Sequence, residues 1–174
     1  MIRPEQHNEC LFNTPRLVCR RWRNSDLDAL YQVYSDPLAM QWVGDRKPIS
    51  LPECHNWLHV TARNYATRGY GMFTLEEQTS GQIAGFCGLV HPGNQPQAEI
   101  KYALRRNLWG QGLASEFVPA LLNHGAQVHG LELIIATVYP QNLASRRVLE
   151  KAGMLLVREF DDDGHTICLY EWHA

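Results

Sequence analysis

The stretch AEIKYALRRNLWGQGLASEF, residues 98–117, decides how this sequence folds. It begins as a strand, crosses the two glycines Gly110 and Gly112, and then takes the apolar spacing of a helix at Leu113 and Phe117. Glycines allow unusual dihedral angles and a close approach of the backbone, and the first turn of a helix offers unpaired N–H groups at the positive end of its dipole. The pattern therefore predicts an anion-binding turn, with an ordinary tight turn as the alternative.

The turn does not carry either of two common nucleotide-binding motifs. A Walker motif requires Gly-Lys-Ser/Thr, and the dinucleotide-binding motif requires a third glycine that is absent here. A nucleotide-binding α/β domain is therefore a weak alternative. The pattern still suits a pyrophosphate held by backbone groups.

The patterns on both sides of this stretch predict an α+β domain with the element order β, α, α, β, β, β, α, β, α, β, β. This order indicates a mixed, mostly antiparallel sheet flanked by about four helices. The expected strands begin at Arg16, Tyr70, Gln82, Ala98, Leu131, Leu155 and His165, and the expected helices cover about 24–35, 50–68, 110–128 and 143–152.

Length and composition favour a single domain. The chain has 174 residues, of which 45% are hydrophobic, so it can bury one sizeable core. It contains no repeat, low-complexity tract or linker, so residues 1–174 are expected to form one domain, with residues 1–13 as an N-terminal extension. The longest apolar runs, GFCGLV and LIIATV, are far shorter than the roughly 20 residues that span a bilayer.

Charge and cysteine usage argue against a nucleic-acid-binding protein, a membrane-bound protein and a disulfide-bonded protein. A formal net charge of -2 creates no global field that would draw the chain to nucleic acid or to an anionic membrane. The five cysteines are scattered and form no CxxC pair, which favours reduced thiols. Cys19, Cys87 and Cys168 lie in expected strands, so burial is favoured over reactivity. The N-terminus lacks the apolar stretch of a secretory signal, and a cytoplasmic location is expected.

Over its full length, the stretch resembles the acetyl-CoA pyrophosphate loop of the GNAT superfamily, whose pattern is Gln/Arg-x-x-Gly-x-Gly/Ala. It is most similar to the branch that contains ribosomal-protein N-terminal acetyltransferases, in which "aEiGY" precedes "WGqGyatEA". VYPQNLASRRVLEKAGM, residues 138–154, is similar to the "NxxSrrvleKxGF" helix of that branch, and TPRLVCRRW and SDP resemble its opening strand and first helix end. The resemblance runs from about Thr14 to the C-terminus and implies a GNAT fold and an acetyl-CoA-dependent N-acetyltransferase without a metal.

The resemblance also implies where acetyl-CoA binds. The strand before the glycine turn would pair with the pantetheine amides, and the turn would hold the pyrophosphate. Asn142 would hydrogen-bond the pantetheine arm, although its position also suits a helix N-cap. Asn107 stands where the family usually has Gln or Arg, so a cationic contact would come from Arg105 or Arg106. The cofactor-binding residues expected are Ala103, Leu104, Arg105, Trp109, Gly110, Gln111, Gly112, Leu113, Ala114 and Asn142.

Transfer from a thioester to an amine needs a neutral nucleophile, an acceptor for its proton and a group that meets the leaving thiolate. Many GNAT members place a tyrosine acid on the helix after Asn142, but the corresponding position here is Leu149. A serine is the proposed acid in the ribosomal-protein branch, so the resemblance assigns that role to Ser145, with a helix-surface serine as the alternative. Glu99 matches the glutamate of "aEiGY" and would bind the acceptor ammonium or receive its proton through water, unless it is an exposed strand carboxylate.

The acceptor is expected to be a primary amine. Deprotonation at pH 7 costs about 4.6 kcal/mol for an alkylamine but about 1.1 kcal/mol for an α-amine. This favours a peptide or protein N-terminus, with a polyamine or antibiotic amine as the alternative. A CoA-binding sensor module without efficient transfer is a second alternative, which Leu149 and Asn107 favour. Because homodimers occur in the similar branch, a homodimer is also considered.

Two polar features allow a second interpretation. His55 and His59 lie four residues apart in an expected helix and could share a face for a metal, but no third ligand is evident and none is expected. With Trp57, they more simply border the acceptor groove that the resemblance implies. The acidic run 161–163 is interpreted as a solvated turn, with attraction of a cationic acceptor as the alternative.

Overall fold

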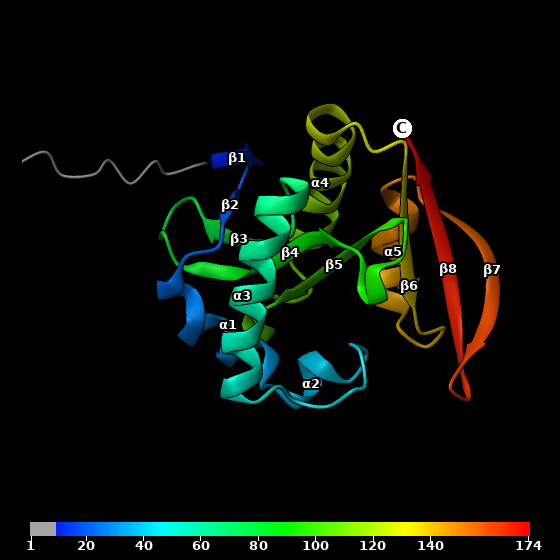
Figure 1. The fold of residues 1–174 in the computed structure, drawn as a ribbon, viewed down its shortest axis with the longest axis horizontal. Coiled ribbons are helices and arrows are strands. Elements are labelled where there is room, and N and C mark those ends of the chain that lie inside the picture. The colour runs from blue at the N-terminus through cyan, green and yellow to red at the C-terminus, as the bar shows by residue number, and fades with distance from the viewer. Residues whose placement is uncertain (1–9) are drawn as a thin grey trace, which may run out of the picture.

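The computed structural model describes residues 10–174, so the expected N-terminal extension lies outside the described part up to residue 9. One eight-stranded sheet, in the order β1-β2-β3-β4-β5-β6-β8-β7, forms the centre of the molecule (Figure 1). The strands are β1 (Cys10–Asn13), β2 (Leu17–Arg21), β3 (Met72–Glu77), β4 (Ile83–Val90), β5 (Ala98–Leu104), β6 (Leu133–Val138), β7 (Leu155–Asp162) and β8 (His165–His173). The α-helices are α1 (Leu27–Tyr34), α2 (Pro37–Met40), α3 (Leu51–Arg68), α4 (Leu113–His129) and α5 (Leu143–Lys151).

The expected α+β architecture is confirmed. The sheet is antiparallel throughout except where β5 and β6 run parallel. Two elements were not expected. The last residues of the expected extension form β1, which pairs with β2 and places Phe12 against the ring of His124 at 5.5 Å between centroids. The other is the single turn α2, whose N-cap is Asp36; the Oδ1 of Asp36 accepts the Leu38 N–H at 3.0 Å.

Local signals set the ends of α3. At its start, the Ser50 N–H donates to Glu53 Oε2 at 2.7 Å, and the Glu53 N–H donates to Ser50 Oγ at 3.4 Å. This reciprocal pair satisfies two N–H groups that a helix start would otherwise leave unpaired. At the other end, Gly69 adopts a left-handed conformation with φ of 82°, which glycine accommodates without a Cβ penalty. The sequence expectation for this helix is confirmed.

Each face of the sheet has its own apolar core. On one face, α4 and α5 bury Phe117, Leu121 and Leu149 against the strands. On the other face, α1 and α3 bury Leu30 and Cys54 in a second cluster. The expected burial of the strand cysteines is confirmed, since Cys19, Cys87 and Cys168 are fully buried.

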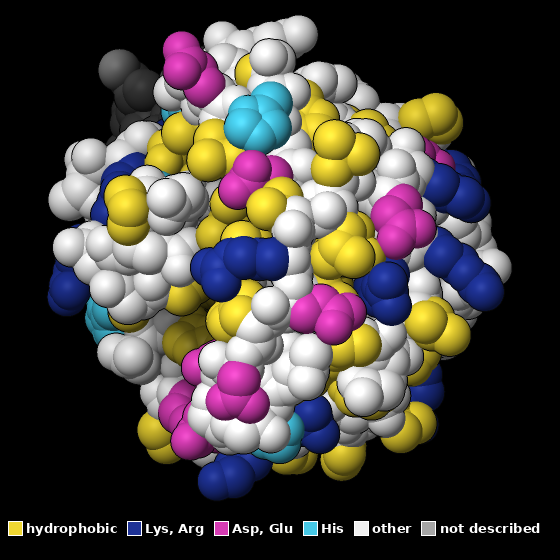
Figure 2. All heavy atoms as spheres, turned by 90° about the vertical axis from the view of Figure 1, so that its right-hand side faces the viewer, with side chains coloured by type: hydrophobic (Ala, Val, Ile, Leu, Met, Phe, Trp, Pro, Cys, Tyr) yellow, Lys and Arg dark blue, Asp and Glu magenta, His cyan; other side chains and the backbone are white. Residues whose placement is uncertain are grey.

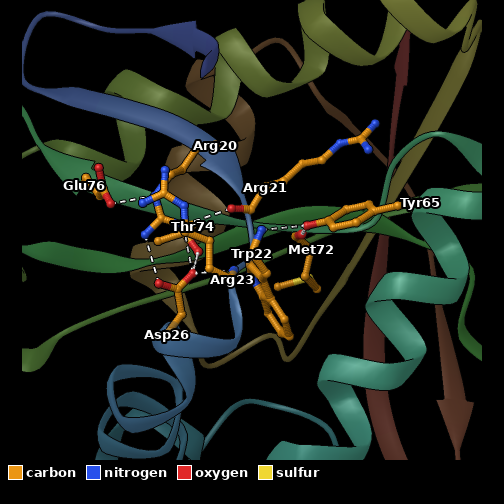
Figure 3. A network of polar contacts seen from close by, with 9 residues as sticks. All are labelled: Arg20, Arg21, Trp22, Arg23, Asp26, Tyr65, Met72, Thr74 and Glu76. Atoms are coloured by element: carbon orange, nitrogen blue, oxygen red, sulfur yellow. Dashed lines mark hydrogen bonds and ion pairs between the residues drawn. The ribbon is translucent and has the colours of Figure 1, made fainter. Parts of the chain in front are cut away.

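A buried polar network attaches the start of α1 to the sheet (Figure 3). The guanidinium of Arg20 donates to both carboxylate oxygens of Asp26, at 2.8 and 2.9 Å, and to Glu76 at 2.5 Å. Asp26 also accepts hydrogen bonds from Thr74 Oγ1 at 2.8 Å and from the Arg23 N–H at 2.9 Å. Burial alone would raise the pKa of Asp26, but these hydrogen bonds outweigh it and hold that pKa below its usual value.

The sheet opens between β5 and β6. These strands pair only at Ala98 with Ile134 and at Glu99 with Ile135, whereas β6 continues to pair with β8 as far as Val138. Beyond Glu99, β5 therefore stays with β4 while β6 leaves it, and the two strands diverge as a fork (Figure 1). The glycine turn follows the end of β5, and α5 follows the end of β6, so the fork lies between the two motifs that the sequence singled out.

No helix within residues 10–174 is long and apolar enough to cross a membrane.

Candidate functional site

The glycine turn leads into the start of α4, where backbone N–H groups are left without acceptors in the described part of the chain. Gly110 and Gly112 have φ of 72° and 78°, and Gly112 is the N-cap of α4 without a side-chain cap. Within residues 10–174, the N–H groups of Leu113, Ala114 and Ser115 have no protein acceptor. A helix of this length directs the positive end of its dipole at the same place. The turn therefore has the donors and the sign of potential that bind an anion.

The cation beside this turn is Arg16, a residue that the sequence analysis did not single out. Its Nη1 donates to the carbonyl of Gln111 at 2.9 Å, and its Nη2 lies 3.7 Å from the position of a Cβ on Gly112. Glu116 holds the guanidinium through Arg16 Nε at 2.7 Å and also accepts from Thr14 Oγ1 at 2.6 Å. Arg16 thus stabilises the turn and places a positive charge beside it, although the two lie about a hundred residues apart in the sequence.

The expected cations take other places. Arg106, in the 3₁₀ turn η3 (Arg106–Leu108), forms an ion pair with Asp36, in which its Nε donates at 2.9 Å. The Nε of Arg105 is buried and has no partner among the described residues. Trp109 is exposed but fixed, because its Nε1 donates to the Leu104 carbonyl at 2.9 Å. Gln111 Nε2 closes the turn by donating to the Asn107 carbonyl at 3.1 Å.

The strand residues expected beside pantetheine differ in orientation. The Arg105 N–H donates to the Ala84 carbonyl at 2.9 Å, and backbone groups alternate in direction along a strand. Ala103 and Arg105 therefore direct their backbone groups toward β4. Tyr102 and Leu104 direct theirs toward the fork, where β6 no longer supplies partners. The edge open to an extended ligand is consequently formed by the backbone groups of Tyr102 and the N–H of Leu104, whose carbonyl accepts from Trp109.

Asn142, Ser145 and Tyr102 meet where α5 begins. Asn142 is the N-cap of α5, and its Oδ1 accepts the Ser145 N–H at 3.2 Å, so the N-cap alternative is confirmed for that oxygen. Its Nδ2 donates to no residue in the range 10–174. The hydroxyls of Ser145 and Tyr102 lie 2.7 Å apart, and burial raises the pKa of Tyr102 to about 12 although the bond to Ser145 lowers it. Ser145 is therefore part of a hydroxyl pair at the fork.

Tyr102 could not be assigned a role from the two motifs, which point only to a serine and a glutamate. Strand alternation was the available signal, since Tyr102 points to the face opposite that of Glu99. It packs edge-on against Phe117 of α4, at 5.6 Å between ring centroids. Leu149, which stands where many GNAT members have a tyrosine, is 2% exposed and belongs to the core. The phenol that contacts Ser145 thus comes from β5.

Glu99 is buried at the point where the fork opens, with 3% of its surface exposed. Its carboxylate accepts from Thr137 Oγ1 of β6 at 2.5 Å and from Gln95 Nε2 at 3.2 Å. It also forms an ion pair with the ammonium of Lys101. The alternative of an exposed strand carboxylate is therefore wrong. Glu99 is a fully engaged group that joins the two diverging strands.

The loop after α2 packs against Tyr139, the residue that follows β6. The guanidinium of Arg46 lies 4.1 Å from the ring centroid of Tyr139, and Trp42 packs on the same ring at 5.8 Å between centroids. Under this loop is a pocket of about 250 Å³, lined on the α3 side by Glu53 and Trp57. Trp57, which the sequence led us to expect at the border of the acceptor groove, thus lines a pocket.

The remaining polar features show no ligand set. His55 and His59 are exposed on α3, and within residues 10–174 no group of three or more His, Cys, Asp or Glu side chains is placed to hold a metal. Residues 161–163 are exposed at the hairpin between β7 and β8, where Asp161 Oδ1 accepts the Gly164 N–H at 3.1 Å. The turn interpretation of the acidic run fits this geometry.

Comparison with known proteins gives one family. Residues 16–155 match the model of the acetyltransferase (GNAT) domain. The chain is 28% identical over 148 residues to the uncharacterized N-acetyltransferase p20 of Bacillus licheniformis, which covers 82% of this chain and 83% of that protein. It is also similar to the crystal structure of an acetyltransferase from Agrobacterium tumefaciens, with a TM-score of 0.81 and 24% identity over 94% of each chain.

A further solved structure is that of RimL, a ribosomal L7/L12 alpha-N-protein acetyltransferase, in complex with coenzyme A. The TM-score is 0.80 at 22% identity, and the match covers 95% of this chain and 98% of that chain. At these identities, the two solved structures support the fold.

Proposed function

Because the chain belongs to the GNAT acetyltransferase family and is an acyltransferase, we propose that it transfers an acetyl group from acetyl-CoA to a primary amine. The amine nitrogen attacks the thioester carbon directly, the carbon–sulfur bond breaks, and the thiolate leaves. The single observation that carries this proposal is the unpaired start of α4 beside Arg16, next to the open edge of β5.

The start of α4 and the open edge of β5 suit the two parts of acetyl-CoA. The N–H groups of Leu113, Ala114 and Ser115 would bind the pyrophosphate, and Arg16 would add a positive charge beside Gly112. The backbone groups of Tyr102 and the Leu104 N–H would pair with the pantetheine amides, as an added strand pairs with a sheet edge. Asn142 Nδ2 would donate to the same arm while its Oδ1 caps α5.

Ser145 is proposed to meet the leaving thiolate. If Tyr102 donates to Ser145 Oγ across their 2.7 Å contact, the Ser145 hydroxyl proton is free to point to the sulfur. A hydrogen bond that forms as negative charge develops stabilises the transition state more than the ground state. Tyr102 then acts as a positioning residue through Ser145.

Glu99 is proposed to position groups at the acceptor side of the fork. Its carboxylate is already bound by Thr137 and Lys101, so the proton of the amine leaves to water. A weak base suffices for an α-amine, whose deprotonation at pH 7 costs about 1.1 kcal/mol, but an alkylamine requires about 4.6 kcal/mol. This difference supports a peptide or protein N-terminus as the acceptor, with a polyamine or antibiotic amine as the second candidate.

The test is thiol release from acetyl-CoA with N-terminal peptides, polyamines and antibiotic amines. We expect amine-dependent release, strongest for an α-amine, that Ser145→Ala and Glu99→Gln weaken. Ser25→Ala, a change at an exposed serine of the 3₁₀ turn η1 (Asn24–Asp26), is the matched control and leaves the rate unchanged. Binding of acetyl-CoA without release by any amine would favour a CoA-binding sensor instead.

A homodimer is proposed through the free edge of β7. This edge strand exposes Leu155, Leu156 and Val157, and on its face of the molecule hydrophobic side chains alternate with charges of both signs (Figure 2). A second copy can pair antiparallel with this edge about a two-fold axis, because β7 has no partner strand on that side within residues 10–174. Sedimentation of the wild type should show a dimer that Val157→Lys dissociates, and a wild-type monomer would refute the proposal.

The cytoplasmic location stays a prediction, which fractionation of cells that produce the protein would test.

A further inference from the structure

The acceptor side of the fork presents an ammonium rather than a carboxylate. Glu99 is 3% exposed, and its two oxygens are occupied by Thr137, Gln95 and Lys101. A cationic ligand would have to displace Lys101 before it could reach this carboxylate. The side chain of Lys101, in contrast, is 39% exposed. The group that a ligand meets first is therefore positive.

Lys101 has hydrogen-bonding capacity left for a ligand. An ammonium carries three N–H donors. One donates to the Glu99 carboxylate, and a second can reach Thr137, whose Oγ1 lies 3.5 Å from Nζ, at the outer limit of a hydrogen bond. At least one donor is thus available to a ligand. Glu99 and Thr137 fix the direction of the ammonium, and a group oriented in this way loses less conformational entropy on binding than a free lysine would.

The position of Lys101 relates it to the reaction site. Along β5, Glu99, Lys101 and Ala103 share one face, and Tyr102 lies on the other face with Ser145. Ala103 belongs to the apolar cluster formed with α1 and α3, so Lys101 faces the side of the sheet that these helices border. An acceptor that approaches the fork from this side passes Lys101 on its way to the thioester.

The other charged groups near this end of β6 are of both signs. Arg46 lies over the ring of Tyr139, two residues beyond Thr137 in the chain, and adds a second cation at this end of β6. On the adjoining strand β8, Glu171 is paired in register with Ile135 and contacts His173 Nε2 at 3.1 Å. The Glu99 charge is buried and matched by Lys101. The pocket beside Arg46 also has the carboxylates of Asp45 and Glu53 in its lining, so the positive charge that a ligand meets at the fork is that of Lys101 itself.

We propose that Lys101 is a specificity-determining residue that binds a carboxylate of the acceptor, so that the favoured acceptors are amines carrying a carboxylate close to the reacting nitrogen. This inference rests on the proposed transferase function and defines its substrate class. Free amino acids and peptides with an acidic residue next to the N-terminus both present this chemistry. Polyamines, which bring only further positive charge, are disfavoured.

The experiment compares acceptors that differ only by a carboxylate or its amide. One pair is a peptide with Glu or Gln as its second residue, and the other is a free amino acid and its α-amide. We expect the wild type to prefer the carboxylate by at least about tenfold in kcat/KM in one pair, as for one charge-assisted hydrogen bond. The pair that shows the preference identifies the source of the carboxylate. Lys101→Met should reduce the ratio to about one, and Lys101→Arg should retain most of it.

A second variant guards against misfolding. Lys101→Met leaves the buried carboxylate of Glu99 without its cation, whereas Glu99→Gln combined with Lys101→Met removes both charges. The double variant should fold and should also lack the preference. A wild-type ratio of about one in both pairs, or a ratio that persists in the double variant, would overturn the proposal and leave the transferase intact.

Failure of the transferase itself is recognised separately. If no acceptor releases thiol, calorimetric binding of the Glu and Gln peptides to the enzyme with CoA decides the role of Lys101. Tighter binding of the Glu peptide that is lost in Lys101→Met supports it, and equal binding refutes it.

Discussion

The glycine that begins α4 provides a sharp test of the donor site. Gly112 has φ of 78°, and a Cβ built there meets no atom closer than Arg16 Nη2 at 3.7 Å. Gly112→Ala therefore requires no shift of neighbouring atoms. Its cost to folding is that of a left-handed alanine, about 1–2 kcal/mol. The new methyl group, however, lies at the turn where the N–H groups of α4 would receive the pyrophosphate.

The expected effect on binding is larger than the effect on stability. A displaced phosphate loses one or two charge-assisted hydrogen bonds at about 1.5–3 kcal/mol each. We therefore expect the Kd for acetyl-CoA, measured by calorimetry, to rise by at least about tenfold, since 1.4 kcal/mol corresponds to a factor of ten. Urea unfolding of the same variant should show a loss of only about 1–2 kcal/mol.

Gly130 supplies the matched control. It caps the other end of α4 with φ of 66°, and a Cβ there meets nothing within 4 Å. Gly130→Ala should have a similar cost to stability but should leave the Kd for acetyl-CoA unchanged, because the two ends of α4 are about 25 Å apart. Equal affinity in Gly112→Ala and wild type, or equal weakening in both variants, would refute the reasoning.

Three further predictions concern the cation at the turn, the hydroxyl pair at the fork and the buried pair of Asp26 with Arg20. Arg16→Ala should raise the Kd for acetyl-CoA about fivefold to tenfold and reduce its dependence on salt in titrations at two ionic strengths, because a positive charge is lost at the turn. Ser145→Ala should lower kcat about tenfold or more at unchanged Kd, and Tyr102→Phe should lower it less, in steady-state thiol release; equal rates in all three enzymes would contradict the hydroxyl pair. Asp26→Asn should lower the free energy of unfolding by about 3 kcal/mol at pH 7, because it disrupts the buried pair with Arg20. The pKa of Asp26 is lowered on folding, so its contribution to the free energy of unfolding is complete above about pH 4 and is lost as pH falls through the folded pKa. In urea unfolding across this pH range, the free energy of unfolding should therefore fall less steeply with acid in the variant than in the wild type.

Sequence alone determined the order of the elements other than β1 and α2, and the two motifs that border the fork. These features depend on local chemistry. The Ser50 and Glu53 capping box, the positive φ of Gly112 and the spacing of the apolar residues on α4 each involve residues within one or two turns of one another. The strand β1 was missed because four residues carry almost no periodic signal and depend on pairing with β2.

Only the tertiary structure decided which groups work together at the site. Arg16 contacts the turn across about a hundred residues, and Tyr102 meets Ser145 across 43. Lys101 was passed over although it lies in the fold-deciding stretch, because a lysine in a strand gives no sign of its partner. Its pairing with Glu99 depends on two residues sharing a strand face and on the divergence of β6 at Thr137. Such contacts depend on distances between strands, and those distances exist only once the sheet has formed.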